Sequence, residues 1–187
     1  MIDAASPFGG ALYIDVGTEN RGLAPFDVTI VGAVNAPYFQ LGITPDDDWN
    51  NEIRNAPAPY AELVSERLII SLPSNLIRTL DNPTDVMTFW NDVVRLQDEI
   101  GGHAARRYMA ERINIDVQVS AGYLHAGYPT QGPVVSAAEI VDLEHLQRTG
   151  SWGWFHELGH EAQRRPDKSW GWDNAYTFDG SVEATVN

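Results

Sequence analysis

The positions of apolar residues divide the chain into a β-rich first part and a helical second part. Short apolar stretches rich in β-branched residues, bounded by glycine, proline and asparagine, predict strands over 26–33 and 67–72. From Pro83 onwards, apolar residues recur at spacings of three and four as far as Ile100. This spacing predicts an amphipathic helix that is ended by Gly101.

Residues 114–120 alternate strictly, which predicts a strand with Ile115, Val117 and Val119 on one face. Three more helices are predicted, over 136–148, over 152–164 and from Ser181 onwards. The fold class that these elements predict is α+β, with a β-rich N-terminal part followed by a helical part.

The composition is that of one globular domain, and it narrows the range of partners. The 187 residues are 43% apolar and 20% charged, and no apolar run is long enough to cross a bilayer. With 26 acidic and 12 basic residues the net charge is −14, which repels nucleic acid and anionic membrane surfaces. The chain has no cysteine, which excludes disulfides, thiolate metal sites and cysteine nucleophiles.

The sharpest chemical signal is the segment His156-Glu157-Leu158-Gly159-His160, within a predicted helix. Residues four positions apart lie on one face of a helix, so the two histidines can bind a single zinc ion. Zinc lowers the pKa of a bound water to about 7, and Glu157 can take a proton from that water without being a ligand. The spacing therefore predicts metal-dependent hydrolysis.

The surroundings of the motif strengthen this prediction. Trp152, Trp154 and Phe155 are expected to pack the helix into a core, which gives a metal site rigid support. Gly159 lies between the two histidines, where the missing side chain permits the close approach of another backbone. The alternative is a surface helix that carries two histidines by chance.

A catalytic zinc site needs a third protein ligand and one open position. Glu183 is the preferred candidate, because Ser181 offers an N-cap for a helix whose first turns contain Glu183. Asn187 lies on the same face of that helix. It is expected to accept a hydrogen bond from the far ring nitrogen of His156, or else to be an ordinary polar residue.

The motif, a spacer and Glu183 resemble the zinc metallopeptidases of family M60, the enhancin-like gluzincins. The resemblance extends to Trp49 and to four upstream segments, over 6–15, 36–44, 58–63 and 121–129. It implies a zinc-dependent endopeptidase in which His156, His160 and Glu183 bind one zinc ion and Glu157 is the general base and acid. It also implies mucin-like O-glycosylated protein substrates and a secreted or cell-surface location of the bacterial type.

The resemblance also bears on the extent of the domain. Catalytic domains of the family continue past the third ligand, so residues 1–187 are expected to be a C-terminally truncated catalytic domain. We expect a monomer that acts on glycoproteins, without nucleic acid or membrane insertion. Two alternatives stay open: a weakly active or inactive fragment that binds glycoproteins or glycans, and a purely structural zinc domain.

Peptidases of this class pair an edge strand with the extended substrate, and the strand over 114–120 is the candidate. The loop that follows it offers three candidates to donate a hydrogen bond to the developing oxyanion, namely Tyr123, His125 and Tyr128. The alternative is that the aromatic rings pack and the histidine caps the loop. Trp170 and Trp172 are candidates for an aromatic rim that binds a sugar, or for core residues.

Overall fold

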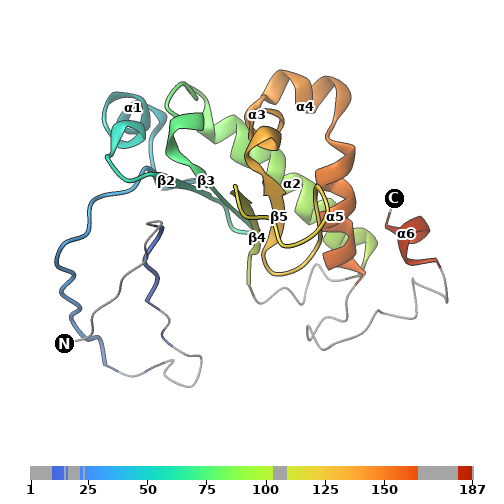
Figure 1. Cartoon of the computed structure of the whole chain (residues 1–187), viewed down its shortest axis with the longest axis horizontal. Helices are drawn as coiled ribbons and strands as arrows, with labels where there is room; N and C mark the ends of the chain where they lie inside the picture. Colours follow the sequence, from blue (N-terminus) through green and yellow to red (C-terminus); the bar gives the residue numbers. More distant parts are fainter. Residues whose placement is uncertain are drawn as a thin grey trace.

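The computed structural model describes residues 10–14, 16, 22, 24–102, 109–163 and 181–186 (Figure 1). In chain order, its elements are β1 Tyr38–Gln40, α1 Asp46–Asn51, η2 Ile53–Asn55, β2 Tyr60–Val64, β3 Leu68–Pro73, η3 Ser74–Leu76, α2 Pro83–Ile100, β4 Glu111–Asp116, β5 Thr130–Pro133, η4 Val134–Ser136, α3 Ala137–Val141, α4 Leu143–Thr149, α5 Trp152–Ala162 and α6 Val182–Thr185. Strands dominate the N-terminal part and helices the C-terminal part, so the predicted α+β class is confirmed.

Five strands form one sheet in the order β1-β2-β3-β4-β5. β2 and β3 form an antiparallel hairpin, whereas the pairs β1–β2, β3–β4 and β4–β5 are parallel. Helix α2 lies along the sheet, and α5 contacts α2 (Figure 1). The sheet and these two helices support the candidate functional site.

Apolar side chains from one face of the sheet form the core together with α2. Leu63, Ile70 and Ile113 come from three neighbouring strands and are fully buried, as are Met87 and Trp90 of α2. Burying a side chain of this size contributes about 1.5–3 kcal/mol. The packing of α2 on the sheet is therefore a major source of the stability of the domain.

Two elements follow the sequence predictions closely. Helix α2 runs from Pro83 to Ile100 and has Gly101 as its C-cap. Strand β3 covers Leu68–Pro73, where a strand is predicted over 67–72. Among the described residues, no helix is both long enough and apolar enough to span a membrane.

No strand forms over 26–33, where the alternation of side chains predicts one. The apolar side chains of this segment are exposed, with Phe26 at 64% and Val31 at 90%. An extended chain becomes a strand only when its backbone N–H and C=O groups pair with a neighbour. Within the described part of the chain, the sheet does not include this segment. The prediction was wrong because alternation carries no information about a pairing partner.

Strand β4 differs from the edge strand predicted over 114–120. It spans Glu111–Asp116 and lies between β3 and β5, so the edge of the sheet on this side is β5. The Asp116 carboxylate accepts hydrogen bonds from the backbone N–H groups of Val117 at 2.6 Å and Gln118 at 3.2 Å. These bonds turn the chain out of the sheet, and Val117 is 82% exposed instead of facing the core.

The helix predicted over 136–148 is two helices, α3 and α4, with Asp142 between them. The Asp142 carboxylate accepts a hydrogen bond from the backbone N–H of His145 at 3.0 Å. It is therefore the N-cap of α4, and it satisfies a backbone donor that a new helix leaves without an intrahelical partner. The spacing of apolar residues continues unchanged from α3 into α4, so it does not predict the break between the two helices.

The opposite face of the sheet carries a polar cluster that the N-terminal segment joins. Arg112 of β4 donates to the Glu62 carboxylate of β2 and, at 2.7 Å, to Ser71 Oγ of β3. The Tyr13 hydroxyl donates to Glu62 and accepts from Arg112 at 3.0 Å. Burial alone raises the pKa of the Glu62 carboxyl. The Ser71 hydroxyl also donates to the Glu62 carboxylate, at 2.7 Å. The hydrogen bonds from Tyr13, Arg112 and Ser71 outweigh burial, so the pKa of Glu62 lies below its ordinary value.

We predict that Glu62→Gln weakens the fold at neutral pH and much less in acid. A lowered carboxyl pKa adds stability that is complete above the unfolded-state pKa of about 4.3 and is lost as the pH falls through the folded-state pKa. Hydrogen bonds to charged groups contribute about 1.5–3 kcal/mol. We therefore expect the free energy of unfolding to fall by about 1–3 kcal/mol at neutral pH, and by progressively less below about pH 4.

Urea unfolding of both proteins across this pH range measures the difference. The control is Glu66→Gln, which removes a carboxylate whose side chain is 80% exposed and which is expected to change stability little. A difference between wild type and Glu62→Gln that does not vary with pH would contradict the prediction.

Candidate metal centre

Helix α5 carries the histidine motif and is held in place by α2. The Phe155 ring of α5 packs against Trp90 and Phe89 of α2, with ring centres 5.7 Å and 6.3 Å away. The side-chain amide of Gln97 donates to the backbone oxygen of Phe155 at 2.8 Å. These contacts fix where α5 lies and how it is rotated about its own axis.

Two glycines let α5 approach β5 and the loop over 121–129. A Cβ atom on Gly132 of β5 would lie 2.4 Å from the Trp154 ring, and one on Gly153 of α5 would lie 2.7 Å from Leu124. Real Cβ atoms do not come this close, so glycine at 132 allows the fully buried Trp154 to pack on β5. The contact of Leu124 attaches the loop to the first turn of α5.

The three predicted ligands come together beside α5. His156 Nε2 lies 3.0 Å from Glu183 Oε2 and 3.2 Å from His160 Nε2. His160 Nε2 lies 3.4 Å from the same carboxylate oxygen. The side chains of His156 and His160 are 11% and 8% exposed, whereas that of Glu183 is 76% exposed. The cluster is therefore enclosed at its histidines and open to solvent at its carboxylate.

These separations fit the coordination of one metal ion. Ligand atoms about 2.0–2.2 Å from a tetrahedral zinc ion are about 3.3–3.6 Å apart, and the three separations here are 3.0–3.4 Å. Two imidazole nitrogens and one carboxylate oxygen are a known donor set of catalytic zinc, with the fourth position open. Among the described residues, this trio is the group that could hold a metal ion.

Helix α6 reaches the histidines because Gly159 has no side chain. A Cβ atom on Gly159 would lie 2.7 Å from both the carbonyl oxygen and Cγ2 of Val186. The close approach of another backbone that the sequence predicts at Gly159 is therefore present in the structure. Glu183, in the same short helix, is brought next to His156 and His160.

Trp152 is not a core residue, contrary to the prediction from the sequence. Its side chain is 70% exposed, and its ring lies 4.8 Å from the His156 ring between centres, at an interplanar angle of 33°. Trp154 and Phe155 do pack into the core, as predicted. The first turn of α5 therefore presents an exposed aromatic surface beside a candidate metal ligand. Trp152 lies four positions before His156 in the sequence, and this spacing predicts that the two rings meet on one face of the helix.

Two further residues of α5 and its C-terminal end bear on the chemistry of the cluster. Glu157 follows His156 directly on α5 and is partly buried, a position that suits a base that is not itself a ligand. Gln163 is the C-cap of α5, and its Oε1 lies 2.9 Å from His160 Nδ1. Gln163 was not predicted from the sequence, although its spacing of three from His160 places both on one side of the helix.

The remaining predicted site residues have other surroundings. Tyr123 and Tyr128 are 60% and 47% exposed. His125 Nε2 lies 2.9 Å from Ser120 Oγ, and the His125 backbone pairs with that of Gln131. This arrangement agrees with the alternative in which the histidine stabilises the loop. Outside the described residues lie Trp170, Trp172 and Asn187.

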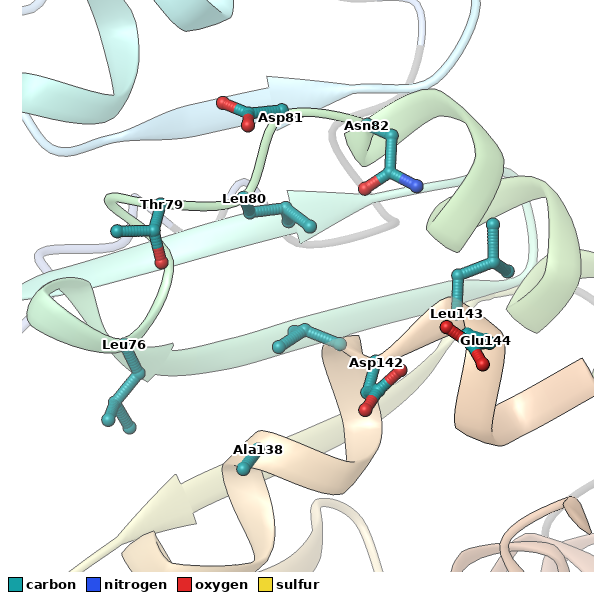
Figure 2. A pocket seen from close by; sticks show the side chains of 10 residues that line it. Leu76, Thr79, Leu80, Asp81, Asn82, Ala138, Asp142, Leu143 and Glu144 are labelled. Atoms are coloured by element: carbon teal, nitrogen blue, oxygen red, sulfur yellow. The ribbon is translucent and has the colours of Figure 1, made fainter.

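A separate hollow of about 470 Å³ lies between the loop over 76–82 and helices α3 and α4 (Figure 2). Two of its carboxylates have structural partners: Asp81 is paired with Arg54, and Asp142 caps α4. Figure 2 shows these two carboxylates on opposite sides of the hollow. Its lining does not include His156, His160 or Glu183. The candidate chemistry is therefore located at α5 and α6.

The α+β fold brings a His-His-Glu cluster together at α5 and α6, a donor set that metallopeptidases use to hold zinc. The family model of peptidase M60, enhancin and enhancin-like, matches residues 32–187. The chain therefore belongs to this family, as the resemblance of its sequence motifs indicates.

Curated relatives of the chain include vertebrate proteins. The chain is 37% identical over 158 residues to TRPM8 channel-associated factor 1 of Bos taurus. It is 40% identical over 158 residues to the TRPM8 channel-associated factor homolog of Xenopus laevis. Each alignment covers 84% of this chain and 17% of the relative, so the chain spans a small part of the length of these proteins.

Solved structures with a similar fold come from bacteria. A functionally unknown conserved protein from Bacillus anthracis str. Ames matches with a TM-score of 0.66 and 21% identity, over 81% of this chain and 32% of that one. A metallopeptidase from Bacteroides thetaiotaomicron matches with a TM-score of 0.61 and 17% identity, over 80% of this chain and 25% of that one. The M60 catalytic domain of Clostridium perfringens ZmpC, in complex with the sialyl T antigen, matches with a TM-score of 0.59 and 13% identity. This match covers 81% of this chain and 31% of that one. At these identities the likeness shows a shared fold.

We predict that Gly159→Ala lowers the affinity for zinc while leaving α5 helical. Alanine stabilises a helix interior by about 0.5–1 kcal/mol relative to glycine. A loss of affinity would therefore come from the displacement of α6 and Glu183. We expect a loss of at least about tenfold, the cost of disturbing the outer support of a metal ligand.

Competition with a fluorescent zinc chelator measures this affinity, and far-UV circular dichroism checks the helix content. Zinc affinity equal to that of the wild type would show that the close approach of α6 at Gly159 is not required.

Proposed function

We propose that this domain is a zinc-dependent endopeptidase that hydrolyses peptide bonds of mucin-like O-glycosylated proteins. The observation that carries the proposal is the convergence of His156, His160 and Glu183, whose facing atoms are 3.0–3.4 Å apart. Glu157 follows His156 directly along α5. Membership of peptidase family M60 supports peptide-bond hydrolysis as the reaction.

The proposed roles follow from the chemistry of each side chain. Zinc, when bound by the two histidines and Glu183, would polarise the scissile carbonyl and a water molecule. The Glu157 carboxylate accepts a proton from that water as the water oxygen bonds to the carbonyl carbon. Glu157 then gives the proton to the amine nitrogen as the C–N bond breaks. One water is consumed, and the carboxylate returns to its starting state.

The substrate class is supported by the surroundings of the cluster and by related structures. Metallopeptidases of the same fold have been solved in complex with the Tn antigen and with the sialyl T antigen. The exposed Trp152 ring next to His156 offers the flat aromatic surface on which a sugar can stack. Tyr123, His125 and Tyr128 stay candidates for the donor to the oxyanion, and Trp170 and Trp172 for the sugar-binding rim.

We place this activity outside the cell or at its surface, where mucin-like glycoproteins occur, and assign it to a monomer. The second candidate function is a glycoprotein-binding module with little or no catalysis. It is favoured by the identity of 37% to a relative that is named for its association with a channel. Cleavage assays on the wild-type protein separate the two functions.

We predict that Glu157→Gln keeps zinc and loses hydrolysis. Removing a general base typically costs about 10²–10⁴-fold in rate, whereas the metal ligands are unchanged. Elemental analysis should give close to one zinc per chain for both proteins. Cleavage of a mucin-type glycoprotein, with and without its glycans, should be seen for the wild type alone and only on the glycosylated form.

The matched control is Glu66→Gln, which removes an exposed carboxylate on another part of the fold. Equal cleavage by wild type and Glu157→Gln would reject the assigned base. One zinc per chain without cleavage by the wild type would favour the binding module instead, and absence of bound zinc would reject the metal centre.

We also predict that Trp152→Ala weakens the binding of glycosylated substrate without loss of zinc. A stacking contact contributes about 0.5–1.5 kcal/mol, so KM should rise about 2- to 13-fold. Steady-state kinetics on a glycopeptide measure the change. Phe26→Ala, which removes another exposed aromatic ring, is the control. An unchanged KM would exclude Trp152 from the substrate site.

A further inference from the structure

Gln163 joins the two helices that carry the candidate metal ligands. It is the C-cap of α5 and is 5% exposed. Its Oε1 lies 2.9 Å from His160 Nδ1. Its Nε2 donates to the backbone oxygen of Val182 at 2.8 Å and to Thr185 Oγ1 at 2.7 Å. One buried amide thus contacts a histidine of α5 and two residues of α6.

These partners fix the orientation of the amide. The carbonyl oxygen of Val182 can only accept a hydrogen bond, so the amide nitrogen must face α6. The amide oxygen then faces His160, and because it can only accept, Nδ1 of a neutral His160 carries the ring proton. The other ring nitrogen, Nε2, keeps its lone pair and lies 3.4 Å from Glu183 Oε2. This is the tautomer that a metal ligand bonded through Nε2 requires.

The amide nitrogen has a second role, because α6 is too short to be stable alone. This helix has four residues, whereas an isolated helix in water needs about 12–15. Gln163 bonds to Val182 and Thr185, which are the two ends of α6. The Thr185 hydroxyl donates in turn to the Ser181 backbone oxygen at 3.2 Å. Glu183 lies between the two points at which Gln163 holds the helix.

We infer that Gln163 is a positioning residue that couples His160 to Glu183 through a single side chain. The inference rests on the metal centre proposed above. The amide oxygen sets the tautomer and the orientation of one ligand. The amide nitrogen sets the position of the helix that carries another. Gln163 therefore acts on a bound ion through His160 and α6.

Three substitutions separate the two halves of the amide. Gln163→Leu removes both halves, whereas Gln163→Glu keeps an acceptor for His160 and removes the donors to α6. Thr185→Val removes one acceptor on α6 and leaves the contact with His160, so it is a control of matched shape. We expect Gln163→Leu to lower zinc affinity about 10- to 100-fold, as for other outer partners of metal ligands. Gln163→Glu should fall between, and Thr185→Val should change least.

A second measurement needs no metal. Nitrogen-15 NMR of the histidine rings in the metal-free chain, at about pH 8 and thus above the ordinary histidine pKa of about 6.5, reports which ring nitrogen is protonated. We expect His160 to be protonated on Nδ1 in the wild type, in Gln163→Glu and in Thr185→Val. Gln163→Leu should lose this preference. Cooperative thermal unfolding checks that each variant is folded.

The results distinguish the inference from the function on which it rests. Absence of zinc binding by the wild type rejects the metal centre, while the tautomer measurement still tests Gln163. Wild-type His160 protonated on Nε2 overturns the inference, and so does a folded Gln163→Leu whose zinc affinity is within about twofold of the wild type. If Gln163→Leu does not fold, Gln163→Glu and the wild-type tautomer decide.

Discussion

The candidate metal centre depends on the contact between α6 and α5 at Gly159. Two histidines one turn apart face the same way on any helix, but the third ligand must come from another part of the chain. Glu183 reaches them because the Val186 carbonyl lies where a side chain at position 159 would be. The same principle operates at the other side of α5, where Gly132 leaves room for the Trp154 ring. Missing side chains thus place the helix between β5 and α6.

The site could be predicted from the sequence as far as it rests on spacing within helices. The period of α5 is enough to bring His156 and His160 together, and an N-cap signal is enough to suggest a helix around Glu183. The roles of Trp152 and Gln163 could not be predicted in this way, because they depend on which faces of α5 the rest of the protein covers. That is decided by tertiary packing on α2 and α6.

In the fold, too, features set within one element were predictable, and features that depend on a second segment or on a single side chain were not. Helix α2 was predictable because its apolar period, its first proline and its final glycine all act within one element. The segment over 26–33 has a suitable pattern but no described partner strand, and pairing is a property of two segments. The end of β4 and the break between α3 and α4 each depend on a single carboxylate, from Asp116 and Asp142. In both places a carboxylate bonds to nearby backbone N–H groups, and these local hydrogen bonds end the strand or the helix although the pattern of apolar residues continues.

The separation of the candidate ligands along the chain has a consequence for stability. His156 and Glu183 are 27 residues apart, so an ion bound to both would close a chain loop of that length. Because the unfolded chain does not hold these ligands together, the ion would bind the folded chain alone, and its binding free energy would add to the free energy of unfolding. In a chain without cysteine, the ion would serve as a reversible counterpart of a disulfide. The supply of metal would then govern how long the protein survives unfolding and proteolysis.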